Sequence, residues 1–399
     1  MRLRRHLRRL VWCALSCCAV GLAGCSNLRP KPAKEYVYVT AKQTYLRDRV
    51  AAVSNRTATV TNGEKLQLLE QGRRFVKVQT ERGEVGWIDE KALATPIIHA
   101  AFDELKLKNA DDPAVASAVV RDEVYLHVRP GRESEKFYLL NEGEKLKLLR
   151  RATIAKPLPP GQHAARIVEP PSPALGAGIP RPASSGTRGE PASVAGPVAP
   201  SMEDWWLVRT SHGDTGWIYS RMIDVDAPDD LTRYSEGQRF VGAYVLTTVN
   251  DPDAPQQNKN VPVYVTVLSP YKAGLPYDFD QVRVFTWSVK KHRYETGFRE
   301  KNVEGYLPVT VSQSRDPYGK GPAALAEAPS FSYRVLAADA APVVPDPVTG
   351  AVVPGKTIVK TYRLEGNLVR RIIAPNTPAE QEAHPEPVLE KQKKGRRRR

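Results

Sequence analysis

Short stretches in which apolar and polar residues alternate recur along most of the chain. The segment FVKVQT at residues 75–80 places Val76 and Val78 on one face of an extended strand, with aromatic and polar side chains on the other. Asn-Gly, Glu-Gly, Arg-Gly and His-Gly pairs separate such stretches, and these pairs favour tight turns. The pattern predicts a mainly β protein built from short antiparallel strands.

One pattern of strands and turns occurs twice. Residues 62–71, NGEKLQLLEQ, correspond to residues 142–151, EGEKLKLLRR, at an offset of 80 residues. The string Gly-x-x-Gly-Trp-Ile occurs at residues 83–88 and again at residues 213–218, at an offset of 130 residues. The second copy therefore carries about fifty additional residues between its two matching halves.

These additional residues, 152–201, consist mainly of Pro, Ala, Gly and Ser. Because such a composition buries too little apolar surface to fold, we predict a disordered Pro-rich insertion. The two copies then occupy residues 36–95 and 117–226. Residues 96–116 between them contain helix formers with apolar residues four positions apart, which predicts a short helical spacer.

The remainder of the chain does not match the repeat. Residues 233–373 contain β-branched and aromatic runs, such as VPVYVTVLSP and QVRVFTWSV, separated by turn pairs. About 140 residues can bury a core of their own, so we predict a C-terminal antiparallel β-sheet or sandwich domain. Residues 374–399 are charged and proline-rich without apolar periodicity, which predicts a disordered basic tail.

The first 24 residues have the layout of an export signal. Five arginines precede an apolar run that is followed by small residues. All four cysteines lie at or before Cys25, so the mature chain can form no internal disulfide and its domains depend on apolar cores. The string at residues 22–25, Leu-Ala-Gly-Cys, resembles the lipobox of bacterial lipoproteins.

This resemblance implies that residues 1–24 are a cleaved lipoprotein signal peptide. It also implies that the Cys25 thiol is joined to diacylglycerol, that its amino group is acylated by a fatty acid such as palmitate, and that residues 25–35 are a linker. Several acyl chains would anchor the protein firmly. In that family Ser26 favours the outer membrane, where the protein would face the periplasm. The alternative is a plain cleavable signal with an incidental cysteine.

Both copies of the repeat resemble bacterial SH3-like modules, which implies two small half-rolled barrels. The motifs of that family are an early strand with Val-Arg, a Gly-Glu-x-hydrophobic strand, Trp-x-x-Val and a closing Gly-x-x-Gly-Trp. The second copy matches them at residues 126–129, 143–146, 205–208 and 213–218. The first copy departs from them, with Tyr45-Leu46-Arg47 in the early strand and Phe75 in place of the tryptophan. The resemblance implies binding of peptidoglycan or its peptides.

The adjacent residues Trp205 and Trp206 point to opposite faces of a strand, so we predict that one of them leaves the core of the module. With Tyr125 and Tyr219 they are the candidate ligand-binding residues of the second copy. The tryptophans of the repeated closing strings are interpreted as core residues, because a large apolar ring behind two glycines is typical of the last turn of a small barrel.

The formal charge of +15 is concentrated at the two ends of the chain. The signal carries five arginines and the last nine residues carry seven positive charges, which leaves +3 for everything between. A nucleic-acid partner is therefore not predicted. On an exported protein, the basic tail predicts contact with anionic lipid or glycan.

The residues that carry chemistry are few. Without a cysteine beyond Cys25, a cysteine nucleophile is excluded. The six histidines after the signal are widely separated and lack metal-ligand spacing, so no metal and no cofactor is predicted. Glu295 and Glu300, which flank Gly297, are interpreted as solvated strand charges. The sequence thus predicts a non-enzymatic envelope lipoprotein that binds peptidoglycan or its peptides; the alternatives are a lipid-anchored scaffold for envelope proteins without wall affinity and, third, a hydrolase in the C-terminal domain.

Overall fold

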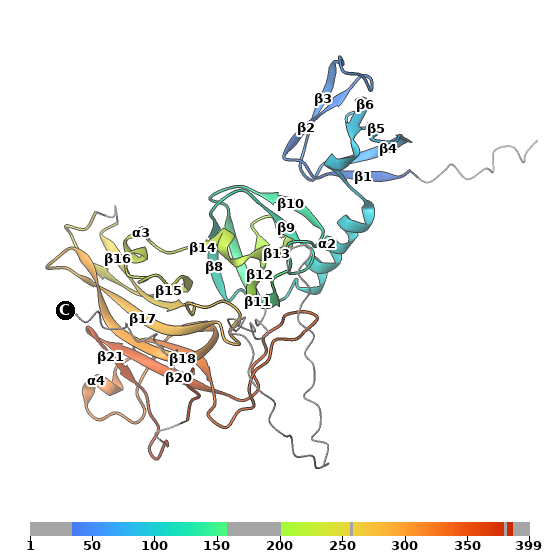
Figure 1. The fold of residues 1–399 in the computed structure, drawn as a ribbon. Coiled ribbons are helices and arrows are strands. Elements are labelled where there is room, and N and C mark those ends of the chain that lie inside the picture. Colours follow the sequence, from blue (N-terminus) through green and yellow to red (C-terminus); the bar gives the residue numbers. More distant parts are fainter. Residues whose placement is uncertain (1–33, 158–200, 256–257, 379–380, 386–399) are drawn as a thin grey trace, which may run out of the picture. The chain divides into compact units, whose positions relative to one another are not determined.

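The computed structural model describes residues 34–157, 201–255, 258–378 and 381–385. The chain divides into two compact units, Met1–Pro96 and Ile97–Arg399. The described residues form three seven-stranded sheets whose neighbouring strands are antiparallel (Figure 1). The prediction of a mainly β protein is therefore confirmed. Cys25 lies outside the described residues.

The first unit contains one sheet, in the order β3-β2-β6-β5-β4-β1-β7. Alternate residues of its strands point inward, so that the inner face forms an apolar core of seven buried side chains. The strands are β1 Tyr36–Val39, β2 Gln43–Arg47, β3 Arg56–Thr61, β4 Lys65–Gln71, β5 Phe75–Gln79, β6 Val85–Asp89 and β7 Leu93–Ala94. The core residues are Val39, Leu46, Val60, Leu66, Val76, Val78 and Ile88.

The second sheet repeats this topology, in the order β10-β9-β13-β12-β11-β8-β14. Its strands are β8 Ala116–Val120, β9 Val124–His127, β10 Lys136–Leu140, β11 Lys145–Ala155, β12 Met202–Thr210, β13 Thr215–Tyr219 and β14 Ile223–Val225. The turns repeat as well: Gly63 and Gly143 have φ of 84° and 80°, and Gly83 and Gly213 have φ of 87° and 85°. Only glycine adopts this backbone conformation readily, which explains why the sequence repeats a glycine there.

Helix α2, Pro96–Lys108, packs against the second sheet. Its one buried residue, Phe102, contacts the rings of Phe137 and Tyr138 at centroid distances of 6.0 Å and 5.3 Å. Leu105 packs on the cluster that contains Trp205 and Trp217. The predicted helix is therefore a packed part of the second sheet as well as a connection.

The predicted insertion at 152–201 begins too early. Residues 152–155 belong to β11, where they pair with residues 202–205 of β12. Ala152 and Thr153 are buried, and the Thr153 amide donates to the carbonyl of Gly350 at 2.7 Å. Residues 152–155 thus continue strand β11, because residues of the C-terminal domain, which contains the third sheet, cover them. Residues 158–200 lie outside the described residues.

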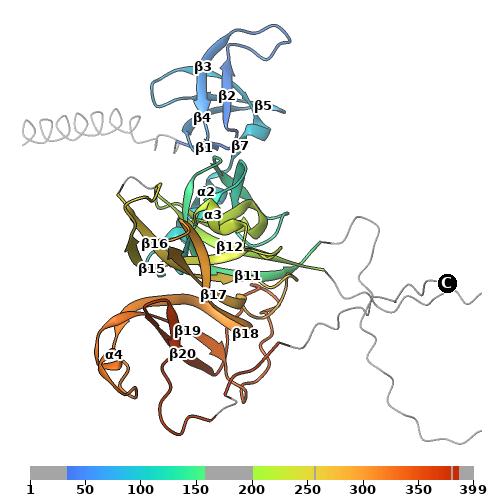
Figure 2. The same ribbon diagram turned by 90° about the vertical axis from the view of Figure 1, so that its left-hand side faces the viewer.

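The third sheet is a meander in which strand order follows chain order, and it is strongly curved (Figure 2). Its strands are β15 Phe240–Asn250, β16 Asn260–Leu268, β17 Phe279–Ser288, β18 Arg293–Ser314, β19 Ala328–Leu336, β20 Thr357–Glu365 and β21 Leu368–Arg371, with short helices α3 Asp229–Thr232 and α4 Pro322–Leu325. Aromatic rings stack across neighbouring strands: Phe331 and Tyr333 of β19 lie 5.3 Å and 5.8 Å from Tyr362 of β20. Such pairs stabilise a sheet beyond the apolar area that they bury.

The prediction of disorder from residue 374 onward is wrong for residues 381–385. The Ala338 amide donates to the carbonyl of Gln381 at 2.8 Å, and the Ala383 amide donates to the carbonyl of Leu336 at 2.9 Å. These bonds attach the segment to the end of β19, and the carboxylate of Glu382 pairs with buried Lys360. Sequence composition missed this contact because its partner lies 22 residues away on another strand. Residues 386–399 lie outside the described residues.

Candidate functional site

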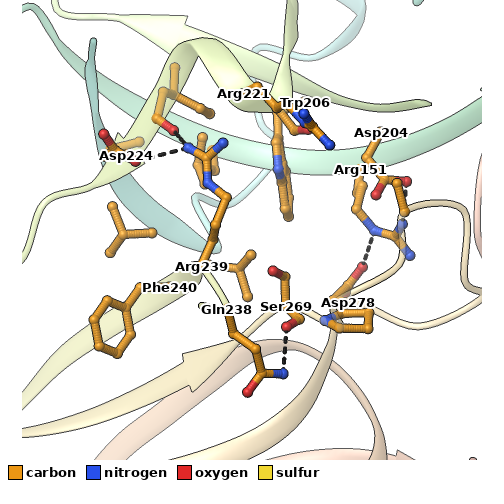
Figure 3. Close-up of a pocket in the computed structure, with 18 of the residues that line it drawn as sticks. Arg151, Asp204, Trp206, Arg221, Asp224, Gln238, Arg239, Phe240, Ser269 and Asp278 are labelled. Carbon is orange, nitrogen blue, oxygen red and sulfur yellow. Dashed lines mark hydrogen bonds and ion pairs between the residues drawn. The ribbon is translucent and has the colours of Figure 1, made fainter. Parts of the chain in front are cut away.

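A pocket of about 370 Å³ lies where the second sheet meets the third (Figure 3). Residues of β8, β11, β12 and β14 line one side, and the start of β15 with the loop at 269–278 lines the other. We call it the junction pocket. Its volume falls in the range of small-ligand sites, about 300–1,000 Å³.

Trp206 forms part of the apolar lining of this pocket. The residue is only 4% exposed, although it belongs to the pair that sequence predicted to be split between core and surface. Alternation along β12 does place Trp205 and Trp206 on opposite faces. The other apolar lining residues include Leu148, Ile223 and Phe240, so a ligand would meet an aromatic and aliphatic wall.

Arginines from separate segments dominate the charged lining. Arg239 pairs with Asp224 at 2.8 Å, and the Nε of Arg121 pairs with the same carboxylate at 3.1 Å. Arg221 is exposed, and within the described residues it has no ion-pair partner. The whole lining contains four arginines and three aspartates, so its formal charge is +1. The pocket therefore favours a ligand that carries a carboxylate or another small anion.

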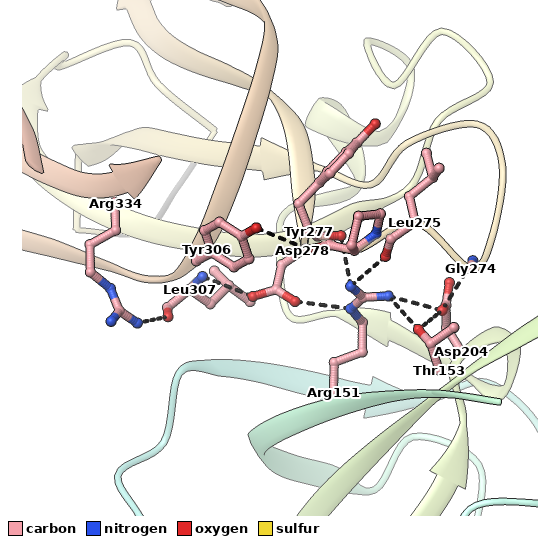
Figure 4. A network of polar contacts seen from close by, with 11 residues as sticks. Arg151, Thr153, Asp204, Gly274, Leu275, Tyr277, Asp278, Tyr306, Leu307 and Arg334 are labelled. Carbon is pink, nitrogen blue, oxygen red and sulfur yellow. Dashed lines mark hydrogen bonds and ion pairs between the residues drawn. The ribbon is translucent and has the colours of Figure 1, made fainter. Parts of the chain in front are cut away.

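Arg151 holds one wall of the pocket in place (Figure 4). Its guanidinium pairs with Asp278 and Asp204, each at 2.9 Å, and donates to the carbonyls of Leu275 and Tyr277 at 2.9 Å and 2.7 Å. Burial alone would lower the pKa of Arg151, but the two carboxylates outweigh it and raise the pKa. With its donors directed at these acceptors, Arg151 fixes the loop at 269–278 against the second sheet.

The structure separates the predicted ligand-binding residues. Trp205 is buried on the face opposite Trp206, where its ring lies 5.7 Å from Tyr219 and 5.2 Å from His127. The prediction that one tryptophan would be exposed is wrong, because the junction covers Trp206 while Leu105, Ile154 and neighbouring rings cover Trp205. Tyr219 remains half-buried, with the Arg132 guanidinium 4.9 Å from the centre of its ring.

Tyr125 lies apart from the junction pocket. It is half-buried on β9, and the Lys136 ammonium lies 4.8 Å from the centre of its ring. Burial, with a smaller contribution from the Glu123 carboxylate, raises the pKa of its phenol. Of the four predicted residues, only Trp206 therefore lines the pocket.

Sequence reasoning missed the pocket arginines. Arg121 and Arg221 follow strands of the second copy, whereas Arg239 comes from the region that showed no resemblance. Each was one of many surface-like cations in a basic chain, and no local signal distinguishes them. They meet only because the second and third sheets pack together.

The interpretation of Glu300 as a solvated charge is also wrong. Its carboxylate pairs with buried Lys360 and accepts hydrogen bonds from the hydroxyls of Tyr333 and Tyr362. Burial alone would raise the pKa of Glu300, but these hydrogen bonds outweigh it and lower the pKa. Glu295, in contrast, pairs with exposed Lys291 at 2.7 Å, as a surface carboxylate does.

Reactive groups are sparse around the pocket. The described residues that line it include no histidine and no cysteine. Across the described ranges, no group of three His, Cys, Asp or Glu side chains is placed to hold a metal ion. Among the helices that the structure describes, none has the length and apolar character needed to cross a bilayer.

No family model matches the chain, and no curated protein matches it either. Two solved structures show partial similarity. One is an NlpC/P60 family protein from Bacillus cereus ATCC 10987, at 12% identity over 54% of this chain and 65% of that chain, just under two thirds, with a TM-score of 0.20. The other is NlpC2 from Trichomonas vaginalis, at 9% identity over 70% of this chain and 99% of that chain, with a TM-score of 0.14. Similarity at this level carries no argument about function.

Proposed function

We propose that the chain is a non-catalytic binding protein of the bacterial cell envelope, and that it holds peptides of peptidoglycan in the junction pocket. The observation that carries this proposal is the pocket itself, in which Trp206 and an excess arginine charge face the same space. A short peptide with a free carboxylate has both an apolar surface for the tryptophan and an anion for the arginines. Peptidoglycan peptides are ligands of this kind.

The proposal assigns separate roles to the lining residues. Trp206 packs against the ligand, Arg221 binds its carboxylate, and Arg239 and Arg121 supply further positive charge from the rim. The two copies of the repeat, read as SH3-like modules, fit the same reading, in which the second copy contributes one wall of the site.

The variant Arg221→Ala tests this assignment. Because Arg221 is exposed and makes no ion pair within the described residues, its removal leaves the fold unchanged. Losing one charged hydrogen bond costs about 1.5–3 kcal/mol, so calorimetry should show roughly tenfold or greater weakening toward soluble wall peptides. The matched control is Arg129→Ala, which removes an arginine that is 70% exposed and does not line the pocket.

Retention on purified sacculi distinguishes a protein that binds peptidoglycan from a scaffold for envelope proteins without wall affinity. Binding to sacculi that Arg221→Ala weakens and Arg129→Ala leaves intact supports wall recognition. Wild-type protein that neither binds sacculi nor binds wall peptides would refute it and leave the alternative, a lipid-anchored scaffold for envelope proteins. Turnover of labelled wall fragments by the wild-type protein would refute the non-catalytic assignment.

The proposed location of the protein at a membrane depends on Cys25 and the basic tail. We infer a lipid anchor at Cys25 in the outer membrane, facing the periplasm, because the lipobox-like string includes the last cysteine of the chain. Cys25→Ser should abolish acyl labelling and release the protein from the membrane fraction; persistent labelling would contradict the inference. The seven positive charges of the tail should strengthen contact with anionic lipid or glycan, and salt should weaken that contact.

A further inference from the structure

A four-residue segment near the carboxyl terminus binds to the third sheet as a short extra strand. Two backbone hydrogen bonds join Gln381 and Ala383 to the end of β19, and Glu382 pairs with Ala337 in an isolated β-bridge. Ala383 also packs on an apolar cluster that contains Leu336 and Tyr277. The His384 ring bonds to the carbonyl of Asn302 at 2.9 Å, so the segment uses backbone pairing, one small apolar contact, one charged side chain and one imidazole hydrogen bond.

Lys360 anchors that charged side chain. Its side chain is 1% exposed, and its ammonium donates to both oxygens of the Glu382 carboxylate, at 2.9 Å and 2.7 Å. It also pairs with Glu300, which two tyrosine hydroxyls hold in position. Because Glu300 neutralises Lys360 independently of the segment, the lysine keeps a partner when the segment leaves. The anchor point is therefore preformed.

The segment itself is weakly attached. Two carboxylates share one ammonium, so the attraction between Glu382 and Lys360 is partly offset by repulsion from Glu300 and by the desolvation of the carboxylates. Pro378 and Pro385 stand on either side of it, and proline cannot donate a backbone hydrogen bond to a ladder. The pairing is thus confined to a few residues, which suits a contact that opens and closes.

We propose that the end of β19 beside Lys360 is a binding slot for an extended peptide whose glutamate reaches Lys360. Residues 381–384 occupy the slot in the isolated chain, and an acidic extended segment of a partner protein replaces them. Recognition of this kind pairs an extended segment with backbone groups that a sheet leaves open, here the Leu336 carbonyl and the Ala338 amide at the end of β19, with backbone bonds for affinity and a side-chain anchor for specificity. The proposal is independent of the junction pocket and of its ligand.

A labelled synthetic peptide with the sequence of residues 378–386, PAEQEAHPE, tests the slot by fluorescence anisotropy on the full chain. In the variant Glu382→Lys the resident segment is repelled by Lys360, so the peptide should bind roughly tenfold or more tightly than to wild type. The same peptide with glutamine at the position of Glu382 should bind roughly tenfold more weakly. The control is Glu327→Lys, an equal charge change at a carboxylate that is 64% exposed and distant in sequence, which should behave as wild type.

Hydrogen exchange gives a second measurement. The Ala338 amide bonds only to the resident segment among the described residues, so its exchange should accelerate in Glu382→Lys and slow again when the peptide is added. If Glu382→Lys does not fold, Glu382→Gln replaces it in both measurements. Equal peptide affinity in wild type and variant, or no binding to either, would overturn the proposal. The proposal would also be overturned if the peptide does not bind, the wild-type protein is a dimer and Glu382→Lys is a monomer. The occupant of the slot would then be a second copy of this chain.

Discussion

Replacing Arg151 by alanine should weaken the contact between the second sheet and the third while each remains folded. The change removes the ion pairs of Arg151 with Asp204 and Asp278, of which the second joins the two sheets, and leaves the carbonyls of Leu275 and Tyr277 without this donor; the Arg239–Asp224 pair across the junction remains. The carboxylates keep part of their partners, since Asp204 still accepts from Thr153 at 2.6 Å and Asp278 still accepts from the Leu307 amide at 3.0 Å.

The expected loss of stability in Arg151→Ala follows from the interactions that are lost and kept. Breaking a buried pair by removing one partner costs about 3–5 kcal/mol, because it leaves uncompensated buried charge. Since the two carboxylates keep other donors and are 19% and 15% exposed, we expect about 3 kcal/mol, the lower end of that range. For a domain of this size the melting temperature should fall by roughly 10 °C.

The assay is thermal unfolding followed both by far-ultraviolet circular dichroism and by tryptophan fluorescence. Because Trp206 is buried at the junction, its emission should shift to the red in Arg151→Ala at temperatures where the β signal is retained. The control Arg129→Ala removes an exposed pair with Glu135 and should cost about 0–1 kcal/mol. An Arg151→Ala variant that melts within 2 °C of wild type, roughly 0.5 kcal/mol, would refute the conclusion that this guanidinium holds the junction.

Three further predictions address the cores and the pH dependence. Trp205→Ala and Trp206→Ala should each lower stability by about 3–5 kcal/mol in denaturant titrations, since both rings are buried, and two unchanged midpoints would contradict this. Gly305→Ala should cost about 1–3 kcal/mol, because an added Cβ would lie 2.0 Å from an aromatic carbon of β17; Gly355→Ala, with no atom within 4 Å of its Cβ, is the control. Because folding lowers the pKa of Glu300, this carboxylate stabilises the fold at pH values above the pKa of an unfolded glutamate, and the contribution is lost as the pH falls through the pKa of the folded state. The melting temperature of Glu300→Gln should therefore depend less on pH than that of wild type between about pH 3 and 5. Equal pH dependence of the two melting temperatures would contradict this role of Glu300.

Local chemistry was sufficient to predict the strands and their turns. Val76 and Val78 face the core as the alternation of β5 predicted, and the glycines of equivalent turns in the two sheets have nearly equal φ. These features depend on a few neighbouring residues, which is why a single sequence contains them. The mainly β class follows from the same signals.

Packing between distant segments was not predictable in this way. The residues next to Trp206 in sequence predict an exposed position on its strand. In the folded protein, β15 and the loop at 269–278 cover it. Arg150 and Arg151 point to opposite faces of β11, and it is the loop at 269–278 that buries the second while the first is 47% exposed. Burial of these residues is a property of the interface between two sheets, and no pattern within either segment encodes it.

The meander of the third sheet also determines how that domain responds to a pulling force. Each strand pairs only with strands adjacent in the chain, so β15 and β21 are the two outer strands and the chain enters and leaves through them. A load applied along the chain therefore peels these outer strands one hydrogen bond at a time, instead of shearing many bonds together. The short segment at residues 381–384 crosses back to the end of β19, so it must detach before the load reaches β21. When the two ends of the chain are pulled apart, this arrangement makes mechanical opening gradual, beginning at the segment that binds beside Lys360.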